Sequence, residues 1–173
     1  MKPILPILLL LSTLASAQHT TQLKPVPQLS FVRSADQLTL EAAFELAKRS
    51  SEKARSFDRE VSVAVLDASG TVVLLLRGDG VGPHNTEAAR RKAYTALSTK
   101  TATLSLLRKS AANPDTQNLN TLPELLLLSG GVPIWYRGNV IGGIGVAGGG
   151  SAENDDIIAR AAALPEQGIL TSK

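Results

Sequence analysis

The sequence predicts an α/β fold, a single-domain sandwich in which a mainly antiparallel five-stranded sheet is flanked by helices. Two stretches alternate apolar and polar residues around short turn signals, which is typical of β-hairpins. Segments of helical periodicity lie before, between and after these hairpins. The resulting order is helix, two strands, helix, two or three strands, helix, which favours helices on both faces of one sheet.

The first helix and the first hairpin follow each other directly. Thr39 is a good capping residue, and apolar side chains recur at helical spacing up to about Ser56. The next stretch turns at Asp67–Gly70, which predicts a hairpin. Its return strand, Val72–Leu76, is apolar on both faces, so we expect it at the centre of the sheet and covered on both sides.

The second helix follows a loop rich in proline and glycine. We expect its cap near Asn85 or Thr86, with Glu87 in the first turn, where the helix dipole favours an anion. Three alanines at helical spacing predict a narrow face that approaches the sheet closely: Ala89, Ala93 and Ala96.

The last third of the chain predicts a polar connector, a second hairpin and a final helix. Asn113–Asp115 marks the connector, and the apolar run 122–131 is interpreted as a buried strand or as a short helix and strand. The second hairpin turns at Arg137–Asn139. The final helix is expected to start at Ser151 and to end near Leu164, because a proline follows.

The N-terminal residues predict export from the cytoplasm. Residues 1–17 combine one lysine, an apolar stretch and a small-x-small site, the pattern of a cleaved signal peptide. Residues 18–37 are polar and interrupted by prolines, so we expect a flexible lead-in to a domain at 38–173. The expected location is therefore secreted or periplasmic.

Composition excludes several classes of function. A formal net charge of +3 and few aromatic residues argue against a nucleic-acid partner. With no cysteine, the chain forms no disulfide, thiolate metal site, Fe–S cluster or covalent haem linkage. There is no nucleophile elbow for a Ser-His-Asp triad, and the acids after Ser151 lack the alternating spacing of a calcium loop.

The glycine-rich stretch at the second hairpin has two interpretations. Gly143, Gly145 and Gly148 resemble part of a dinucleotide-binding fingerprint, but they lie in a hairpin strand and not in a βαβ unit. We therefore expect Gly142, Gly143 and Gly145 to permit close packing against a neighbouring element.

Several separated motifs, in this order, resemble the GlcG/HbpS family over residues 38–164. They are Val65–Gly70, Arg77–Gly80, Arg91–Ala96, Gly130–Ile134 and Gly142–Val146. The resemblance is to the secreted haem-binding members above all, and it extends to the C-terminal domain of PduO-type proteins. It implies an α/β sandwich, homo-oligomers and non-covalent binding of haem or a related tetrapyrrole.

Haem chemistry then selects candidate residues around the second helix. His84 is the candidate axial metal ligand, because imidazole is a common donor to haem iron. Arg90, Arg91 and Lys92 are candidates for pairing with the propionates, and Thr95 is a candidate weak oxygen donor to ferric iron. The alternative interpretation is that His84 caps or orients the helix, while the basic residues form a solvated face.

The motifs and the candidate residues leave two classes of function. The favoured one is an extracytoplasmic protein that sequesters or senses haem, one form of it being an accessory of a membrane sensor partner. The alternative is an enzyme of the same fold that acts on a small metabolite or degrades haem.

Overall fold

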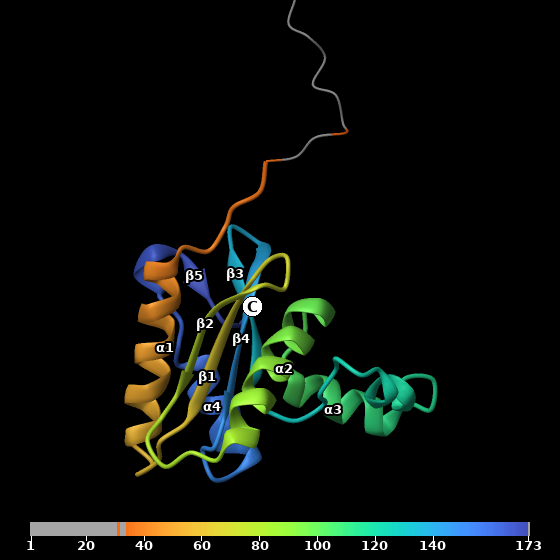
Figure 1. The fold of residues 1–173 in the computed structure, drawn as a ribbon. Coiled ribbons are helices and arrows are strands. Elements are labelled where there is room, and N and C mark those ends of the chain that lie inside the picture. Colours follow the sequence, from red (N-terminus) through yellow and green to blue (C-terminus); the bar gives the residue numbers. More distant parts are fainter. Residues whose placement is uncertain (1–30, 32–33, 173) are drawn as a thin grey trace, which may run out of the picture. The chain divides into compact units, whose positions relative to one another are not determined.

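The computed structural model describes residue 31 and residues 34–172. The expected signal peptide and most of the lead-in at 18–37 lie outside these residues. One compact unit comprises Ala35–Lys173. Figure 1 labels its α-helices and strands. In chain order the elements are α1 (Leu40–Arg55), β1 (Ser62–Asp67), β2 (Val72–Arg77), α2 (Pro83–Thr99), α3 (Thr103–Ala112), η1 (Gln117–Thr121), β3 (Gly131–Tyr136), β4 (Asn139–Ala147), α4 (Ala152–Arg160), η2 (Pro165–Gln167) and β5 (Ile169–Leu170).

One antiparallel sheet organises the fold, with the strand order β2-β1-β4-β3-β5. The hairpins β1–β2 and β3–β4 are joined at the centre by the pairing of β1 with β4, and the short β5 extends the edge beside β3. The fold class predicted from the sequence is therefore confirmed.

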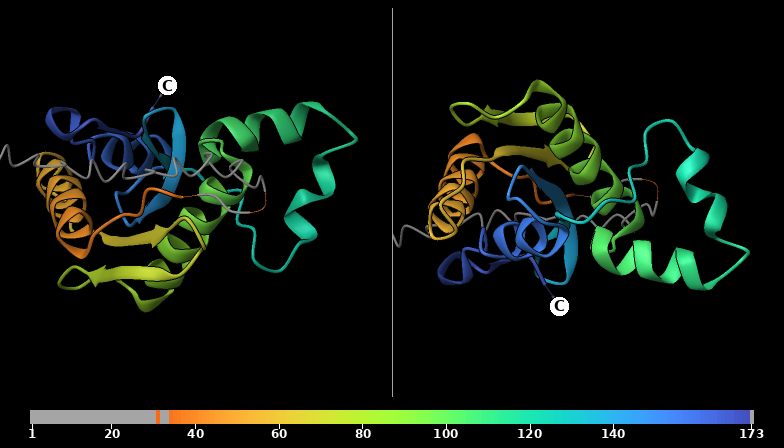
Figure 2. Two further views of the ribbon diagram at one scale, coloured as in Figure 1. Left: turned by 90° about the horizontal axis from the view of Figure 1, so that it is seen from above. Right: turned by 90° about the horizontal axis from the view of Figure 1, so that it is seen from below.

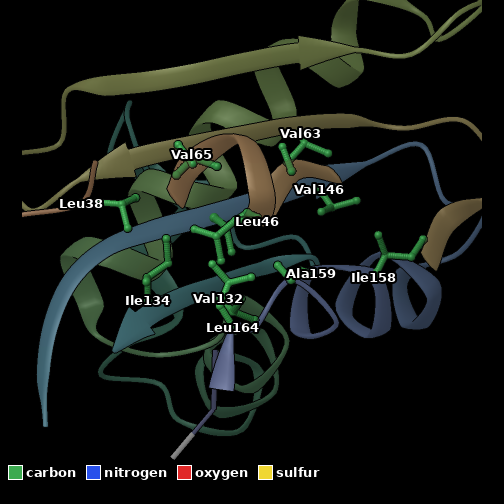
Figure 3. Close-up of a cluster of buried hydrophobic side chains, with 14 of the residues drawn as sticks. Leu38, Leu46, Val63, Val65, Val132, Ile134, Val146, Ile158, Ala159 and Leu164 are labelled. Carbon is green, nitrogen blue, oxygen red and sulfur yellow. The ribbon is translucent and has the colours of Figure 1, made fainter. Parts of the chain in front are cut away.

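Helices cover both faces of the sheet (Figure 2). On one face, α1 and α4 enclose the larger core, in which Leu46, Val65, Ile134 and Ile158 are completely buried (Figure 3). On the other face, α2 packs along β4 and β1 through Ala89 and other small residues. Each strand of the central pair therefore contributes side chains to two different cores.

The glycines of β4 allow α2 to lie unusually close to the sheet. A Cβ atom built on Gly145 would overlap the carbonyl oxygen of Ala89, and one built on Gly143 would overlap that of Ala93. These contacts leave no room for a side chain. The close packing predicted for these glycines is confirmed.

The position predicted for Val72–Leu76 is wrong, because β2 lies at the edge of the sheet and not at its centre. Val72 and Leu75 are 39% and 44% exposed, whereas Val73 and Leu74 pack partly against the larger core. An apolar run marks a strand with contacts on both faces, but it does not reveal whether a second strand pairs with it.

The start of the second helix also differs from the prediction. Gly82 is its N-cap and makes no side-chain cap bond, and Pro83 occupies the first helical position, where its missing N–H is harmless. Asn85 and Thr86 consequently lie inside the first turn and do not cap it. Glu87 falls beyond the first turn.

The helix α3, which occupies the part of the chain between α2 and the polar connector, was not predicted from the sequence. The run 122–130 forms neither helix nor strand, so its prediction as a buried strand or a helix and strand is wrong up to the start of β3. Ser151 caps α4 as predicted, by accepting from the N–H of Asn154, but the helix ends at Arg160 and not near Leu164. Among the described residues, no helix is long and apolar enough to cross a membrane.

Candidate functional site

All five candidate residues lie on α2. Three of them, His84, Arg91 and Thr95, are spaced seven and then four residues apart, so they follow one face of the helix. With a rise of about 1.5 Å per residue, His84 and Arg91 are separated by about 10 Å along the axis. These three side chains therefore form a row along α2, from its exposed first turn to its buried middle.

His84 is exposed in the first turn of α2. Its ring lies over the preceding loop, because a Cβ atom built on Gly82 would be 2.8 Å from the imidazole Cε1. Its imidazole has no hydrogen-bond partner among the described residues, and no other described residue is a histidine. This ring is thus available as a donor to a ligand.

Arg90 is held by two carboxylates. Its guanidinium donates to both oxygens of Glu87, at 2.9 and 2.8 Å, and to Glu124 Oε2 at 3.1 Å. The hydrogen bonds to Glu87, followed by that to Glu124, raise the pKa of Arg90 above its usual range. In the same way, the Arg90 hydrogen bond lowers the pKa of Glu87. About a quarter of the Arg90 side chain remains exposed, so this charge borders solvent.

Arg91 and Thr95 bind the backbone that follows η1, residues 122–126, which we call the clamped segment. Arg91 donates to the carbonyl oxygens of Pro123 and Leu125, both at 2.7 Å. The Thr95 hydroxyl accepts from the N–H of Leu126 at 2.8 Å and donates to the carbonyl oxygen of Arg91 at 2.7 Å. Together with the ion pair between Arg90 and Glu124, these bonds fix the clamped segment on α2.

Lys92 points into the protein and is 3% exposed. Its ammonium donates to Asp155 Oδ2 at 2.7 Å and to the carbonyl oxygen of Val146 at 2.9 Å. Burial lowers the pKa of Lys92, and the charge and hydrogen bond of Asp155 oppose that shift. Lys92 would reach a bound ligand only after this buried pair opened.

The clamped segment leads into one wall of an apolar hollow of about 390 Å3. The opposite walls are α3 and η1, and the lining is mostly aliphatic: Leu107, Ser110, Ala111, Gln117, Asn120, Leu126, Leu127 and Leu128. Leu128 is 52% exposed at this hollow, and Leu122 is 51% exposed beside the clamp. A flat apolar molecule has a surface of matching chemistry here.

The second helix was predicted from the sequence, but this hollow was not, because the run 122–128 was interpreted as a buried strand or as a short helix and strand. The only available signal was Pro123, which disfavours a regular strand. Within residues 34–172, no group of three or more histidine, aspartate or glutamate side chains is placed to hold a metal ion.

Comparison with known proteins places this fold in a family. Residues 38–164 match the family described as "Haem degrading protein HbpS-like". The crystal structure of HbpS is 40% identical, with a TM-score of 0.72 over 79% of this chain and 95% of that one. The crystal structure titled "PduOC:Heme Complex" is 29% identical, with a TM-score of 0.68 over 80% of this chain and 100% of that one.

A curated relative is the corrinoid adenosyltransferase PduO of Salmonella typhimurium strain LT2. It is 32% identical over 68% of this chain, but the match spans only 35% of PduO itself, about a third of its length. The resemblance to the GlcG/HbpS family that the sequence motifs indicated is confirmed. This chain belongs to the HbpS-like family.

Proposed function

We propose that this chain binds haem, or a closely related tetrapyrrole, non-covalently and outside the cytoplasm, where it sequesters or senses the ligand. One observation carries the proposal: the chain is similar, over 80% of its length, to a structure solved as a haem complex. The similarity covers all of the chain in that structure.

The chemistry of α2 and the neighbouring hollow supports this proposal. Haem needs an axial donor, partners for two carboxylates and an apolar surface. His84 offers an exposed imidazole, Arg90 offers a partly exposed guanidinium, and the hollow beside Leu128 offers aliphatic surface. When bound, haem would supply an iron centre whose reactivity depends on its axial ligand.

His84 is the axial ligand that we propose over Thr95. The Thr95 hydroxyl is completely buried and already accepts from Leu126 and donates to Arg91. Coordination of iron by Thr95 would require breaking this hydrogen bonding and moving the clamped segment. His84 requires only rotation of an exposed side chain.

The three basic residues then have different proposed roles. Arg90 pairs with a propionate by turning from Glu124, which shares its guanidinium. Arg91 acts mainly by holding the clamped segment, and Lys92 by holding the buried junction with Asp155. The ligand-binding surface would therefore be shaped by residues that do not all touch the ligand.

The cellular setting of the proposal rests on the sequence of residues 1–17, which has the pattern of a signal peptide. A secreted or periplasmic haem binder would encounter haem before it enters the cell. We further propose that the chain acts as a homo-oligomer and that a membrane sensor is the partner that would receive a haem signal.

Titration of the purified protein with haemin tests the proposal. For the parent protein we expect a saturable change in the Soret band. His84→Ala should shift the ferric Soret position and weaken haem binding at least tenfold. Arg90→Gln should weaken haem binding without shifting the band. Lys48→Ala, on the exposed face of α1, is the control variant and should match the parent protein. Absence of a saturable Soret change in the parent protein would refute haem binding.

The same titration decides between His84 and Thr95. A Soret shift in Thr95→Val together with a parental spectrum in His84→Ala would transfer the axial role to Thr95. Circular dichroism of both variants would show whether either result comes from loss of the fold.

Degradation of haem is the alternative function, and the description of the matching family favours testing it. After loading with haemin, a reductant should leave the Soret band intact if the protein only stores or senses haem. Progressive loss of the band, with release of a small-molecule product, would support an enzyme instead.

A further inference from the structure

A second cavity, remote from His84, gathers basic side chains at the far end of α2. It has a volume of about 540 Å3 and is lined by residues from four parts of the chain: Lys100, Thr101, Ala102, Ser105, Lys109, Pro133, Trp135, Arg160, Thr171 and Ser172. We infer that this cavity, here called the basic cavity, binds a small dianion bearing carboxylate or phosphate groups.

Among the described residues, the charged side chains that line the basic cavity are all basic. Its described lining includes two lysines and one arginine and no carboxylate. Arg160 is paired with Asp156 through Nε at 2.6 Å, so its charge is largely compensated. Lys100 and Lys109 form no ion pair with any described residue. A cleft with one sign of charge and a low-dielectric wall concentrates ions of the opposite sign.

The backbone and hydroxyl groups at the basic cavity add hydrogen-bond donors. Lys100 follows the last turn of α2, and α3 begins at Thr103 without a side-chain cap on its first N–H groups. Ala102 and Ser105, which flank that start, both line the basic cavity. The Ser105 hydroxyl has no hydrogen-bond partner among residues 34–172. The Ser105 hydroxyl and the uncapped N–H groups of α3 therefore add donors beside the lysines. The C-terminal ends of α2 and α4, at Lys100 and Arg160, contribute partial negative charge that the basic side chains must offset.

The rest of the lining limits the size and kind of ligand. Trp135 and Pro133 come from the same face of β3 and provide an apolar wall, while Thr171 is tied to the carbonyl oxygen of Arg160 at 2.6 Å. Two separated lysine charges beside an apolar wall suit a compact molecule with two anionic groups. A lysine ammonium is a compact charge that accepts either carboxylate or phosphate.

This chain contains a single tryptophan, Trp135, which lines the basic cavity, so a change in tryptophan emission reports on the surroundings of this residue. Titration of the full chain with succinate and with inorganic phosphate, each at constant ionic strength, should give a saturable change in tryptophan emission. The anion with the lower half-saturation identifies the preferred group. Binding should weaken when sodium chloride is raised, because salt screens the lysine charges.

Two double variants with the same change in net charge make the test specific. Lys100→Gln combined with Lys109→Gln should raise the half-saturation concentration at least tenfold. Lys48→Gln combined with Lys53→Gln removes two charges from α1 and should leave it unchanged. Calorimetric titration with the same anions provides a second readout that does not depend on the emission of Trp135.

Two results would overturn the inference. One is the absence of saturable binding of either anion by both fluorescence and calorimetry. The other is an equal loss of binding in the two double variants, which would mean that the anions respond to overall charge and not to the basic cavity.

Discussion

Lys92 and Asp155 form a buried ion pair that joins α2 to α4 across the end of the sheet. The lysine Nζ lies 2.7 Å from Asp155 Oδ2, and the other carboxylate oxygen accepts from the N–H of Gly149 at 2.7 Å. The carbonyl oxygen of Val146, at the end of β4, completes the set. The side chain of Lys92 thus connects α2 with α4 and with the central strand β4. Apolar packing alone would leave polar backbone groups unpaired at this place.

Lys92→Met should therefore be among the most destabilising single changes in this chain. The variant leaves the carboxylate of Asp155 buried without its cation, and loss of one partner from a buried pair costs about 3–5 kcal/mol. Chemical denaturation followed by circular dichroism measures this loss of free energy of unfolding. Lys48→Met, which removes a lysine whose side chain is 63% exposed, should change it by less than about 1 kcal/mol. Equal effects of the two variants would contradict a structural role for Lys92.

Thr95→Val should loosen the clamped segment. Valine has nearly the shape of threonine but removes the oxygen that accepts from Leu126 N–H, at an expected cost of about 1–3 kcal/mol. Hydrogen exchange should accelerate at the amide of Leu126, while Thr95→Ser should keep the parental rate.

Thr99→Val is the matched control for the clamped segment. The Thr99 hydroxyl donates to the carbonyl oxygen of Thr95 within the same helix and forms no hydrogen bond with residues 122–126. Exchange at Leu126 should remain parental in this variant. Unchanged exchange in Thr95→Val would show that Arg91 holds the segment without help from Thr95.

The fold could be predicted from the sequence where local signals and packing agree. The turn at Asp67–Gly70 and the cap at Ser151 are local, so they could be recognised without knowledge of the fold. The edge position of β2 depends on which strands pair across the sheet, and a single sequence carries little information on that pairing. The apolar run 122–128 shows the same limit, because it does not enter the sheet and its residues 126–128 line a hollow beside α3.

The candidate site was predictable as a set of residue types but not as a geometry. Arg91 and Thr95 were identified correctly as neighbours on one helix, whereas His84, expected just before that helix, lies in its first turn. Their partners, such as the backbone of Pro123 and Leu125, lie more than thirty residues away in sequence. Every residue has a backbone carbonyl, so the sequence does not show which carbonyls accept hydrogen bonds from a side chain. Only the structure shows which candidate side chains are already hydrogen-bonded and which are available. The role of these residues in haem binding stays a prediction.

Asp67→Asn should destabilise the protein at neutral pH and much less in acid. Ser69 donates from its hydroxyl at 2.6 Å and from its backbone N–H at 2.8 Å, and Thr71 N–H donates at 3.0 Å. The hydroxyl bond is the largest cause that lowers the pKa of Asp67 below its ordinary value of 3.8, and the backbone bonds add to it. A carboxylate with a depressed pKa stabilises the folded state above that ordinary value and loses this contribution as pH falls through the folded pKa.

The expected cost of Asp67→Asn is on the order of 1 kcal/mol near pH 7, because solvent screens this partly exposed turn. The difference from the parent protein should shrink as pH falls below 3.8. Denaturant unfolding at several pH values measures the cost of the substitution near pH 7 and its decrease in acid. Asp115→Asn, at an exposed position, is the control. A pH-independent difference would indicate that the turn depends on the shape of the side chain and not on its charge.

The contact between α2 and the glycines of β4 should tolerate no added side chain. Gly143→Val must displace the carbonyl of Ala93, because even a Cβ atom would overlap its oxygen. Overpacking of this kind costs about 1–3 kcal/mol when side chains can yield, and we expect a loss at or above that range because the obstacle is backbone. Gly138→Asn is the control: this turn glycine has a φ of 79° and nothing within 4 Å of its added Cβ, and asparagine tolerates that conformation. Thermal unfolding should show a large fall in Tm for Gly143→Val and little change for Gly138→Asn. An unchanged Tm for Gly143→Val would mean that α2 can move away from β4 without loss of stability, and that the glycines are not required for this packing.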